Sequence, residues 1–130
     1  MALVAVDTDV LIDHLKGIES AVEHVRELAQ SNRLRTTTIN IFELLSGAEN
    51  SKRGEMVKSL VGMLEAFPLD RRSAAAAAQI RGELQAAGQA IGMGDSLIVG
   101  ICVAHDVPLM TGNHKHFSRV QGLEVIRVNR

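Results

Sequence analysis

The chain has 130 residues, of which 46% are hydrophobic, so it is long enough to bury the core of one domain and too apolar for a disordered protein. Its 14 Lys and Arg balance 15 Asp and Glu to a net charge of −1, which argues against a protein that holds nucleic acid through bulk positive charge alone. The absence of Trp and Tyr and the single Cys102 exclude a base-stacking platform, an internal disulfide and a cysteine zinc site.

Two features of the sequence bear on location and organisation. No apolar stretch is long enough to span a membrane, and Asp7 and Asp9 interrupt the apolar run near the start that a signal peptide would need. We therefore predict a soluble cytoplasmic protein. Because no linker or repeat divides the chain, we also predict one domain over residues 1–130.

The first half of the chain predicts alternating strands and helices. Leu3–Val6 is a short, continuous apolar run, as expected of a strand that is buried on both faces. The β-branched residues of Leu34–Thr37 predict a second strand. Apolar residues at helical spacing predict helices over residues 10–15, 18–31, 39–47 and 56–64.

The second half continues this pattern. Phe67–Leu69 predicts a brief extended link or strand, and Asp70 is placed to cap an alanine-rich helix that ends at Gly88. After the loop 89–94, Asp95–His105 is apolar nearly all round and predicts a central buried helix. The remaining predicted elements are a strand at 107–110, a polar loop with a short helical turn at 111–118 and an edge strand at 123–128. The alternation predicts an α/β fold, with three α/β/α layers around a central parallel sheet of four to five strands.

Acidic residues stand at the edges of these apolar runs. Asp7 follows the first strand, Glu43 lies on the helix after the second strand, and Asp95 opens the buried helix. Asn113 comes just after the strand at 107–110. Because ligands bind beyond the carboxyl ends of the strands in open parallel sheets, we expect all four side chains to face one rim. A cation relieves the repulsion among such carboxylates, so the pattern favours a Mg²⁺ or Mn²⁺ site of the kind that serves phosphodiester cleavage.

Each acid also has a purely structural explanation. Asp7 and Asp95 could cap the helices that begin beside them, and Glu43 could pair with Asn40 in a capping box. Asp9 is predicted to be either a cap or a partner of the cluster.

Other polar residues give weaker signals. Asp13 is predicted to be a solvated helix residue, and Cys102 to pack in the core. His114 and His116 favour surface roles over metal binding, because no third soft ligand is near them. The sequence contains no phosphate-binding loop and no serine-nucleophile motif.

Four segments, in a fixed order along the chain, carry the strongest motif signal: Val6–Ile12, Thr38–Leu44, Ile91–Ile98 and Leu109–Phe117. Each segment is weak alone. Together, over almost the whole chain, they resemble the PIN domain family, and within it the VapC-type toxins of toxin–antitoxin pairs. The stretch Ile80–Leu84 followed by Gly88 is also typical of these toxins.

The resemblance implies a Mg²⁺- or Mn²⁺-dependent endoribonuclease, whose first three acids fall on Asp7, Glu43 and Asp95. The family's fourth acidic position falls on Asn113, which removes one carboxylate from a second metal site, and Asp9 stands where Asn is usual. The resemblance further implies a homodimer and a cognate VapB-like antitoxin whose C-terminal segment lies in the toxin's groove. It implies a transfer RNA or a ribosomal RNA loop as the target.

This interpretation assigns a role to each residue of the site. Asp7 and Asp95 would coordinate the metal, Glu43 would bind the metal or act as general base toward the attacking water, and Asn113 would hydrogen-bond to a water of the metal. Five basic residues are candidates for contacting RNA phosphates: Arg33, Arg35, Arg53, Lys115 and Arg119.

Two alternatives stay open. The altered fourth position also fits a catalytically impaired PIN-like module that acts mainly by binding a partner protein. The apolar stripes of Ile18–Ser31 and Glu55–Phe67 either form the antitoxin groove or a dimer contact, or only cover the sheet.

Overall fold

The computed structural model describes residues 2–129 and contains one parallel sheet in that range. Its strands are β1 (Val4–Val6), β2 (Leu34–Thr37), β3 (Glu65–Phe67), β4 (Leu109–Thr111) and β5 (Val125–Arg127). Their order across the sheet is β3-β2-β1-β4-β5, and every neighbouring pair is parallel. The predicted parallel sheet of four to five strands is therefore confirmed, with β5 as an edge strand.

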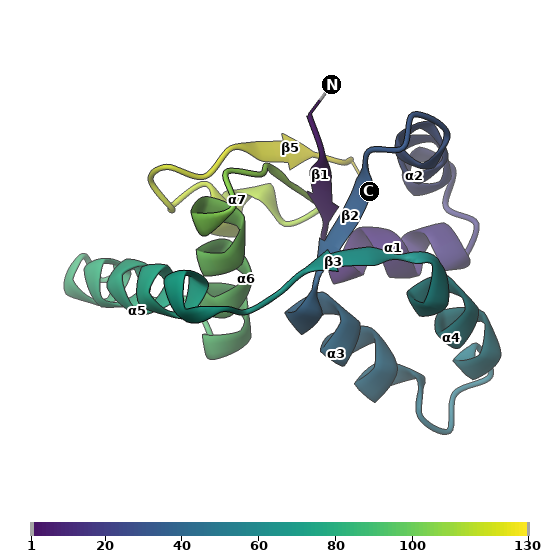
Figure 1. The fold of residues 1–130 in the computed structure, drawn as a ribbon, viewed down its shortest axis with the longest axis horizontal. Coiled ribbons are helices and arrows are strands. Elements are labelled where there is room, and N and C mark those ends of the chain that lie inside the picture. Colours follow the sequence, from purple (N-terminus) through teal and green to yellow (C-terminus); the bar gives the residue numbers. More distant parts are fainter. Residues whose placement is uncertain (1, 130) are drawn as a thin grey trace.

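Helices connect the strands and lie on both sides of the sheet. They are α1 (Thr8–Leu15), α2 (Glu19–Gln30), α3 (Thr38–Ala48), α4 (Gly54–Met63), α5 (Arg71–Ala86), α6 (Met93–Ala104) and α7 (His114–Phe117). Figure 1 shows α5, α6 and α7 on one side and α1, α2 and α4 on the other, which confirms the three-layer α/β/α arrangement. None of the helices within the described residues is long and apolar enough to cross a membrane. The assignment of residues 1–130 to a single domain stays a prediction, and residues 1 and 130 lie outside the described part.

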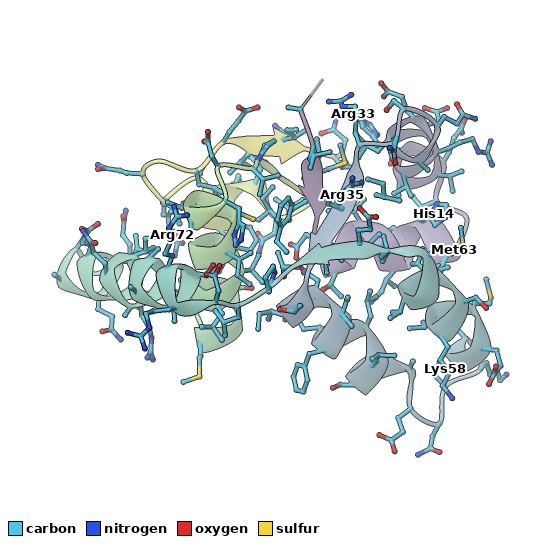
Figure 2. All side chains as sticks on the ribbon, in the orientation of Figure 1. His14, Arg33, Arg35, Lys58, Met63 and Arg72 are labelled. Atoms are coloured by element: carbon cyan, nitrogen blue, oxygen red, sulfur yellow. The ribbon has the colours of Figure 1, made fainter. Side chains whose placement is uncertain are left out.

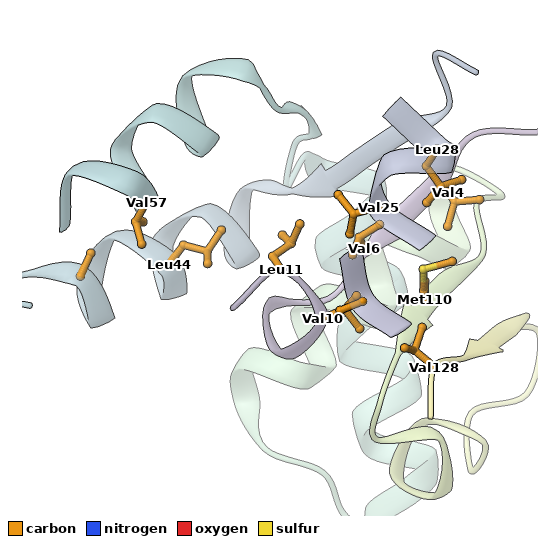
Figure 3. Close-up of a cluster of buried hydrophobic side chains, with 12 residues drawn as sticks. Val4, Val6, Val10, Leu11, Val25, Leu28, Leu44, Val57, Met110 and Val128 are labelled. Atoms are coloured by element: carbon orange, nitrogen blue, oxygen red, sulfur yellow. The ribbon is translucent and has the colours of Figure 1, made fainter. Parts of the chain in front are cut away.

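The alternation of side chains along the strands divides the core in two. Val4 and Val6 point from β1 toward α1, α2 and α3, together with Met110 from β4. This first cluster is drawn in Figure 3. Ala5 and Leu109 point to the opposite face, where they meet α5 and α6. Because successive strand residues face opposite ways, the short strands β1 and β4 are buried on both faces, which for β1 is what its continuous apolar run predicts.

The bounds of several elements follow from residues that start or stop them. β2 occupies the predicted segment, and Asp70 caps α5 by accepting a hydrogen bond from the Ser73 N–H at 2.9 Å, as predicted. The predicted link Phe67–Leu69 is displaced, because β3 ends at Phe67, directly before Pro68. The predicted helix Asp95–His105 begins two residues earlier, at Met93.

One prediction about a buried acid is wrong. Asp13 was expected to be solvated, but it is only 6% exposed in the structure. It lies on the same face of α1 as Val10, which belongs to the core, and this helical spacing carries Asp13 inward. Cys102 is buried in the core, as predicted.

The two apolar helices that could form a groove differ in how far they are covered. α2 buries Ala21, Val25 and Leu28 against the sheet. α4 buries only Val57 fully, while Met56 is 49% exposed and Met63 is 82% exposed. The apolar stripe of α2 therefore covers the sheet, whereas α4 presents apolar side chains to solvent.

Candidate active site

The candidate site lies at the carboxyl edge of the sheet, at the point where the strand order reverses. β1 pairs with β2 on one side and with β4 on the other, so the chain leaves these strands in opposite directions. Asp7 directly follows β1, and Thr111 is the last residue of β4. The Thr111 hydroxyl donates a hydrogen bond to Asp7 Oδ2 at 2.8 Å. This contact holds the Asp7 carboxylate at the crevice between the ends of the two strands.

Asp7 is both a helix cap and a member of the polar cluster. It is the N-cap of α1, and its Oδ1 accepts a hydrogen bond from the Thr8 N–H at 2.9 Å. The Asn40 Nδ2 donates to the same oxygen at 3.0 Å. The Asn40 amide cannot rotate freely, since its Oδ1 accepts a hydrogen bond from the Thr37 hydroxyl at 2.6 Å. Buried Asn40 thus fixes Asp7 to the start of α3.

Glu43 joins this network through Thr8. The Thr8 hydroxyl accepts a hydrogen bond from Asn40 Nδ2 at 2.9 Å and donates one to Glu43 Oε1 at 2.6 Å. The structure excludes the alternative of a capping box between Asn40 and Glu43. Thr37, in extended conformation, is the N-cap of α3, and its hydroxyl accepts from the Asn40 N–H at 3.2 Å. The helix begins at residue 38 and not at the predicted residue 39, so its N-cap is Thr37. The Glu43 side chain therefore does not cap the helix and contacts Thr8 instead.

Asp95 reaches the site from the first turn of α6. The structure excludes the alternative that Asp95 caps this helix, because the N-cap is Gly92 and Asp95 is the third residue after it. A Cβ atom placed on Gly94 would lie 3.5 Å from Glu43 Oε2, so the start of α6 packs beside Glu43. The charge of Asp95 also raises the pKa of Asp7. Asp95 Oδ2 lies 2.8 Å from His116 Nε2.

Asp9 and Asn113 take different positions relative to these three acids. Asp9 Oδ2 accepts a hydrogen bond from the Gly112 N–H at 3.1 Å, and its charge raises the pKa of Asp7, so it is a partner of the cluster. Asn113 is exposed, and its backbone N–H donates to Thr111 Oγ1 at 3.1 Å. Within residues 2–129, the Asn113 side chain makes no hydrogen bond to Asp7, Glu43 or Asp95.

The electrostatics of the site centre on Asp7. Burial raises the pKa of its carboxyl from 3.8 to about 6, and repulsion from Asp9 adds to the rise. The hydrogen bonds from Thr111 and Thr8 act in the opposite direction, and Asp95 contributes a smaller further rise. The ionised Asp7 is therefore held at a free-energy cost that a bound cation would remove.

The chemistry of the donors suits a hard, hydrated cation. Asp7, Glu43 and Asp95 offer only carboxylate oxygens, the ligand type that Mg²⁺ and Mn²⁺ prefer. Within the described range 2–129, no group of three or more His, Cys, Asp or Glu side chains is arranged to enclose a metal ion by itself. Mg²⁺ does not require such a cage, since it keeps several waters and binds through one or two carboxylates. The residues therefore fit Mg²⁺ or Mn²⁺ better than zinc.

Thr37, Asn40 and His116 belong to the cluster, but the sequence does not identify them as site residues. Thr37, Asn40 and Glu43 are spaced by three, which places them along one side of a helix, and this spacing is a signal that could have linked Asn40 to Glu43. The prediction of a surface role is wrong for His116, whose half-buried ring contacts Asp95. No spacing in the sequence connects His116 to an acid 21 residues earlier.

The candidate RNA-contacting residues are not all near the site. Arg33 precedes β2 and donates from Nε to the Ala2 carbonyl at 2.7 Å, which places it at the amino edge of the sheet. Arg35 forms an ion pair with Glu65 at 3.0 Å. Figure 2 labels both arginines beside β2, with Arg33 toward its start. Lys115 is exposed on α7, next to His116, whose ring contacts Asp95.

Comparisons with known proteins agree with one another. The model of the PIN domain family matches residues 4–123. A tRNA(fMet)-specific endonuclease VapC of Salmonella typhimurium is 31% identical over 114 residues, which cover 83% of this chain and 86% of that protein. Ribonuclease VapC10 of Mycobacterium tuberculosis is 27% identical over 122 residues, covering 94% and 91% of the two chains.

Solved structures of VapBC complexes are also similar to this chain. The chain is similar to VapBC2 from Rickettsia felis bound to a DNA fragment from its promoter, with a TM-score of 0.86 and 25% identity over 98% of this chain and 99% of that chain. It is also similar to DNA-bound VapBC from Salmonella typhimurium, with a TM-score of 0.85 and 28% identity over 96% and 97% of the two chains.

Proposed function

This chain belongs to the PIN domain family, and from that membership we propose that it is the ribonuclease toxin of a toxin–antitoxin pair, with its reaction centre at an acidic Mg²⁺ or Mn²⁺ site. The observation that carries the proposal is the buried Asp7 carboxylate at the reversal point of the sheet, with its pKa raised to about 6. Two relatives that cover most of the chain are named as ribonucleases, which supports RNA as the substrate class.

Asp7 and Asp95 would hold the cation, and Glu43 would act on water. A divalent cation bound there would stabilise the negative charge that develops on the scissile phosphate. Glu43 Oε1 is engaged by the Thr8 hydroxyl at 2.6 Å, which orients the carboxylate and leaves Oε2 to accept a proton from the attacking water. Thr8 thus couples the position of Glu43 to that of Asn40 and Asp7. Asn113 would have to turn inward to bind a water of the metal.

The substrate and the partner follow from the relatives. One relative is named as specific for tRNA(fMet), so we propose transfer RNA as the first substrate to test, with ribosomal RNA loops as the second. Two similar structures are VapBC complexes, so we propose a VapB-like antitoxin as the partner, together with a homodimer of the toxin. An RNA substrate would place the protein in the cytoplasm.

Cleavage of RNA by purified protein tests the proposal. We expect transfer RNA to be cut in the presence of Mg²⁺ or Mn²⁺ and to stay intact with EDTA. Asp7→Asn, Glu43→Gln and Asp95→Asn should each lower the cleavage rate by about 100-fold or more, because each removes a metal ligand or the base.

Two matched changes serve as controls. Asp106→Asn and Glu49→Gln alter exposed residues outside the cluster, so both should cleave at the wild-type rate. Full metal-dependent cleavage by Asp7→Asn would remove the site assignment. A wild-type protein that cuts no RNA with either metal, yet binds its antitoxin tightly, would establish the alternative of an impaired module that acts by binding.

A further inference from the structure

His116 has a defined place beside the site. It lies on α7, the short helix that follows β4, and its Nε2 is 2.8 Å from Oδ2 of Asp95 in α6. The side chains of His116 and Asp95 are 22% and 35% exposed, so this contact is partly shielded from water. The imidazole also packs edge-on against Phe117, with ring centroids 5.2 Å apart and an interplanar angle of 82°. Phe117 is buried in the core, so the ring of His116 rests on a rigid support.

This contact restrains the Asp95 carboxylate. An ionised carboxylate can only accept hydrogen bonds, so His116 Nε2 must carry the hydrogen and donate it to Oδ2. One oxygen of Asp95 is thereby occupied, and the rotation of the carboxylate is limited. The other oxygen, Oδ1, stays available to a cation. Asp7, by contrast, is held by Asn40 and Thr111, so each of the two acids has hydrogen-bond partners of its own.

We propose that His116 is a positioning residue, which holds Asp95 in the orientation that a divalent cation requires. The inference rests on the proposed metal site, and it assigns to His116 an effect on metal affinity that acts through Asp95. Carboxylates that bind metals are themselves hydrogen-bonded, and loss of such a supporting partner lowers metal affinity by about 10- to 100-fold.

The opposite effect, a gain in metal affinity when His116 is removed, is also physically possible, and this makes the proposal testable. If the imidazole instead occupied the place of the cation, its removal would free Asp95 and strengthen metal binding. The sign of the change in affinity therefore separates positioning from competition.

Calorimetric titration of the protein with Mn²⁺, in the absence of RNA, shows whether replacing His116 lowers or raises the affinity for the metal. His116→Leu keeps an apolar group against Phe117 but removes the donor, and we expect it to weaken Mn²⁺ binding by about 10- to 100-fold. His116→Gln retains an N–H donor at the position of Nε2, so it should keep most of the affinity. His114→Leu, on the same helical turn, is the matched control and should bind Mn²⁺ like the wild type.

The outcomes distinguish this inference from the proposed function. If the wild type binds no Mn²⁺, the metal site and the inference both fail. If the wild type binds Mn²⁺, Asp7→Asn does not, and His116→Leu binds as tightly as the wild type or more tightly, only the role of His116 is overturned. Should His116→Leu fail to fold, His116→Asn replaces it, because its shorter amide does not reach Asp95, and the same comparison with His116→Gln applies.

Discussion

Asp7 is a residue whose ionisation opposes folding. Its pKa is about 6 in the folded protein and 3.8 in the unfolded chain, so the folded state binds the proton more tightly. The stabilisation from this proton is fully present below about pH 3.8, and it is lost as the pH rises through 6. A shift of this size corresponds to roughly 3 kcal/mol, since one pKa unit is worth about 1.4 kcal/mol. A carboxylate that destabilises its own protein at neutral pH indicates a functional role for that position.

We predict that Asp7→Asn stabilises the protein at neutral pH. Asparagine is uncharged at every pH, so the variant does not lose the stability that the wild type loses between pH 4 and pH 7. The free energy of unfolding of the variant, relative to the wild type, should therefore rise by up to roughly 3 kcal/mol over this range. Urea unfolding at a series of pH values measures it.

Added Mg²⁺ provides the control for this prediction. Because the cation offsets the repulsion at Asp7, it should raise the unfolding midpoint of the wild type at pH 7 and leave that of Asp7→Asn unchanged. A difference between the two proteins that stays constant with pH would contradict the assignment of a raised pKa to Asp7.

At the scale of single residues, the sequence predicts the site only in part. Asp7, Glu43 and Asp95 stand out because each follows or opens an apolar run, and that signal is local. The roles of Asn40 and His116 depend on contacts across 33 and 21 residues, and no local pattern reports such contacts. The burial of Asp13 cannot be predicted from the sequence for the same reason, since it depends on what packs over α1.

Among the elements, α5 and α6 approach each other closely at Gly100. A Cβ atom there would lie 2.5 Å from Ala77 Cβ, 2.6 Å from the Ser73 carbonyl oxygen and 2.7 Å from the Ala77 backbone nitrogen. Two of these three atoms belong to the backbone of α5 and cannot move aside. Buried Ala77 and Ser73 supply the small surface on α5 that this approach requires.

We predict that Gly100→Ala destabilises the protein by about 1–3 kcal/mol or more, because the added methyl group forces the two helices apart. Gly82→Ala is the matched control. It lies within α5, where a Cβ atom meets nothing within 4 Å, so the better helix propensity of alanine should stabilise the protein by about 0.5–1 kcal/mol. Urea unfolding of both variants measures the contrast, and equal stabilities would rule out the close packing of α5 on α6.

The boundaries of elements show where sequence patterns lose precision. Strand β2 and the Asp70 cap are predicted correctly because β-branched residues and an N-cap carboxylate act locally. The start of α6 is missed by two residues, because Gly92 caps it without a side-chain hydrogen bond and leaves no mark in the sequence. The order of the strands lies beyond any local pattern, since β4 inserts between β1 and β5.

At the scale of the whole molecule, α4 leaves large apolar side chains exposed to solvent. A shallow groove between α1 and α4 is lined by Leu15, Met56, Leu60 and Met63, with His14 at its side. Figure 2 labels His14 and Met63 near each other at the edge formed by these helices. We expect the antitoxin to cover this groove, because large exposed apolar side chains are typical of protein contact sites.

We predict that Met63→Asp lowers the affinity for the cognate antitoxin by about tenfold or more, since it places a charge in an apolar contact. RNA cleavage and stability should stay unchanged, as Met63 is 82% exposed and lies outside the acidic cluster. Leu69→Asp, at a position that is 39% exposed in the link before α5, is the control and should bind normally. Calorimetry with the antitoxin measures both, and wild-type affinity for Met63→Asp would exclude this groove as the contact.

Strand β4 is synthesised long after β1, and this affects when the crevice can form during translation. Thr111 contacts Asp7 across 104 residues, and β4 fills the place beside β1 that completes the crevice. A nascent chain that stops short of this strand lacks one wall of the crevice, even when its earlier helices have formed. During translation the crevice therefore cannot be complete before residue 111 has been added, so a molecule that binds the crevice requires chains that already include β4.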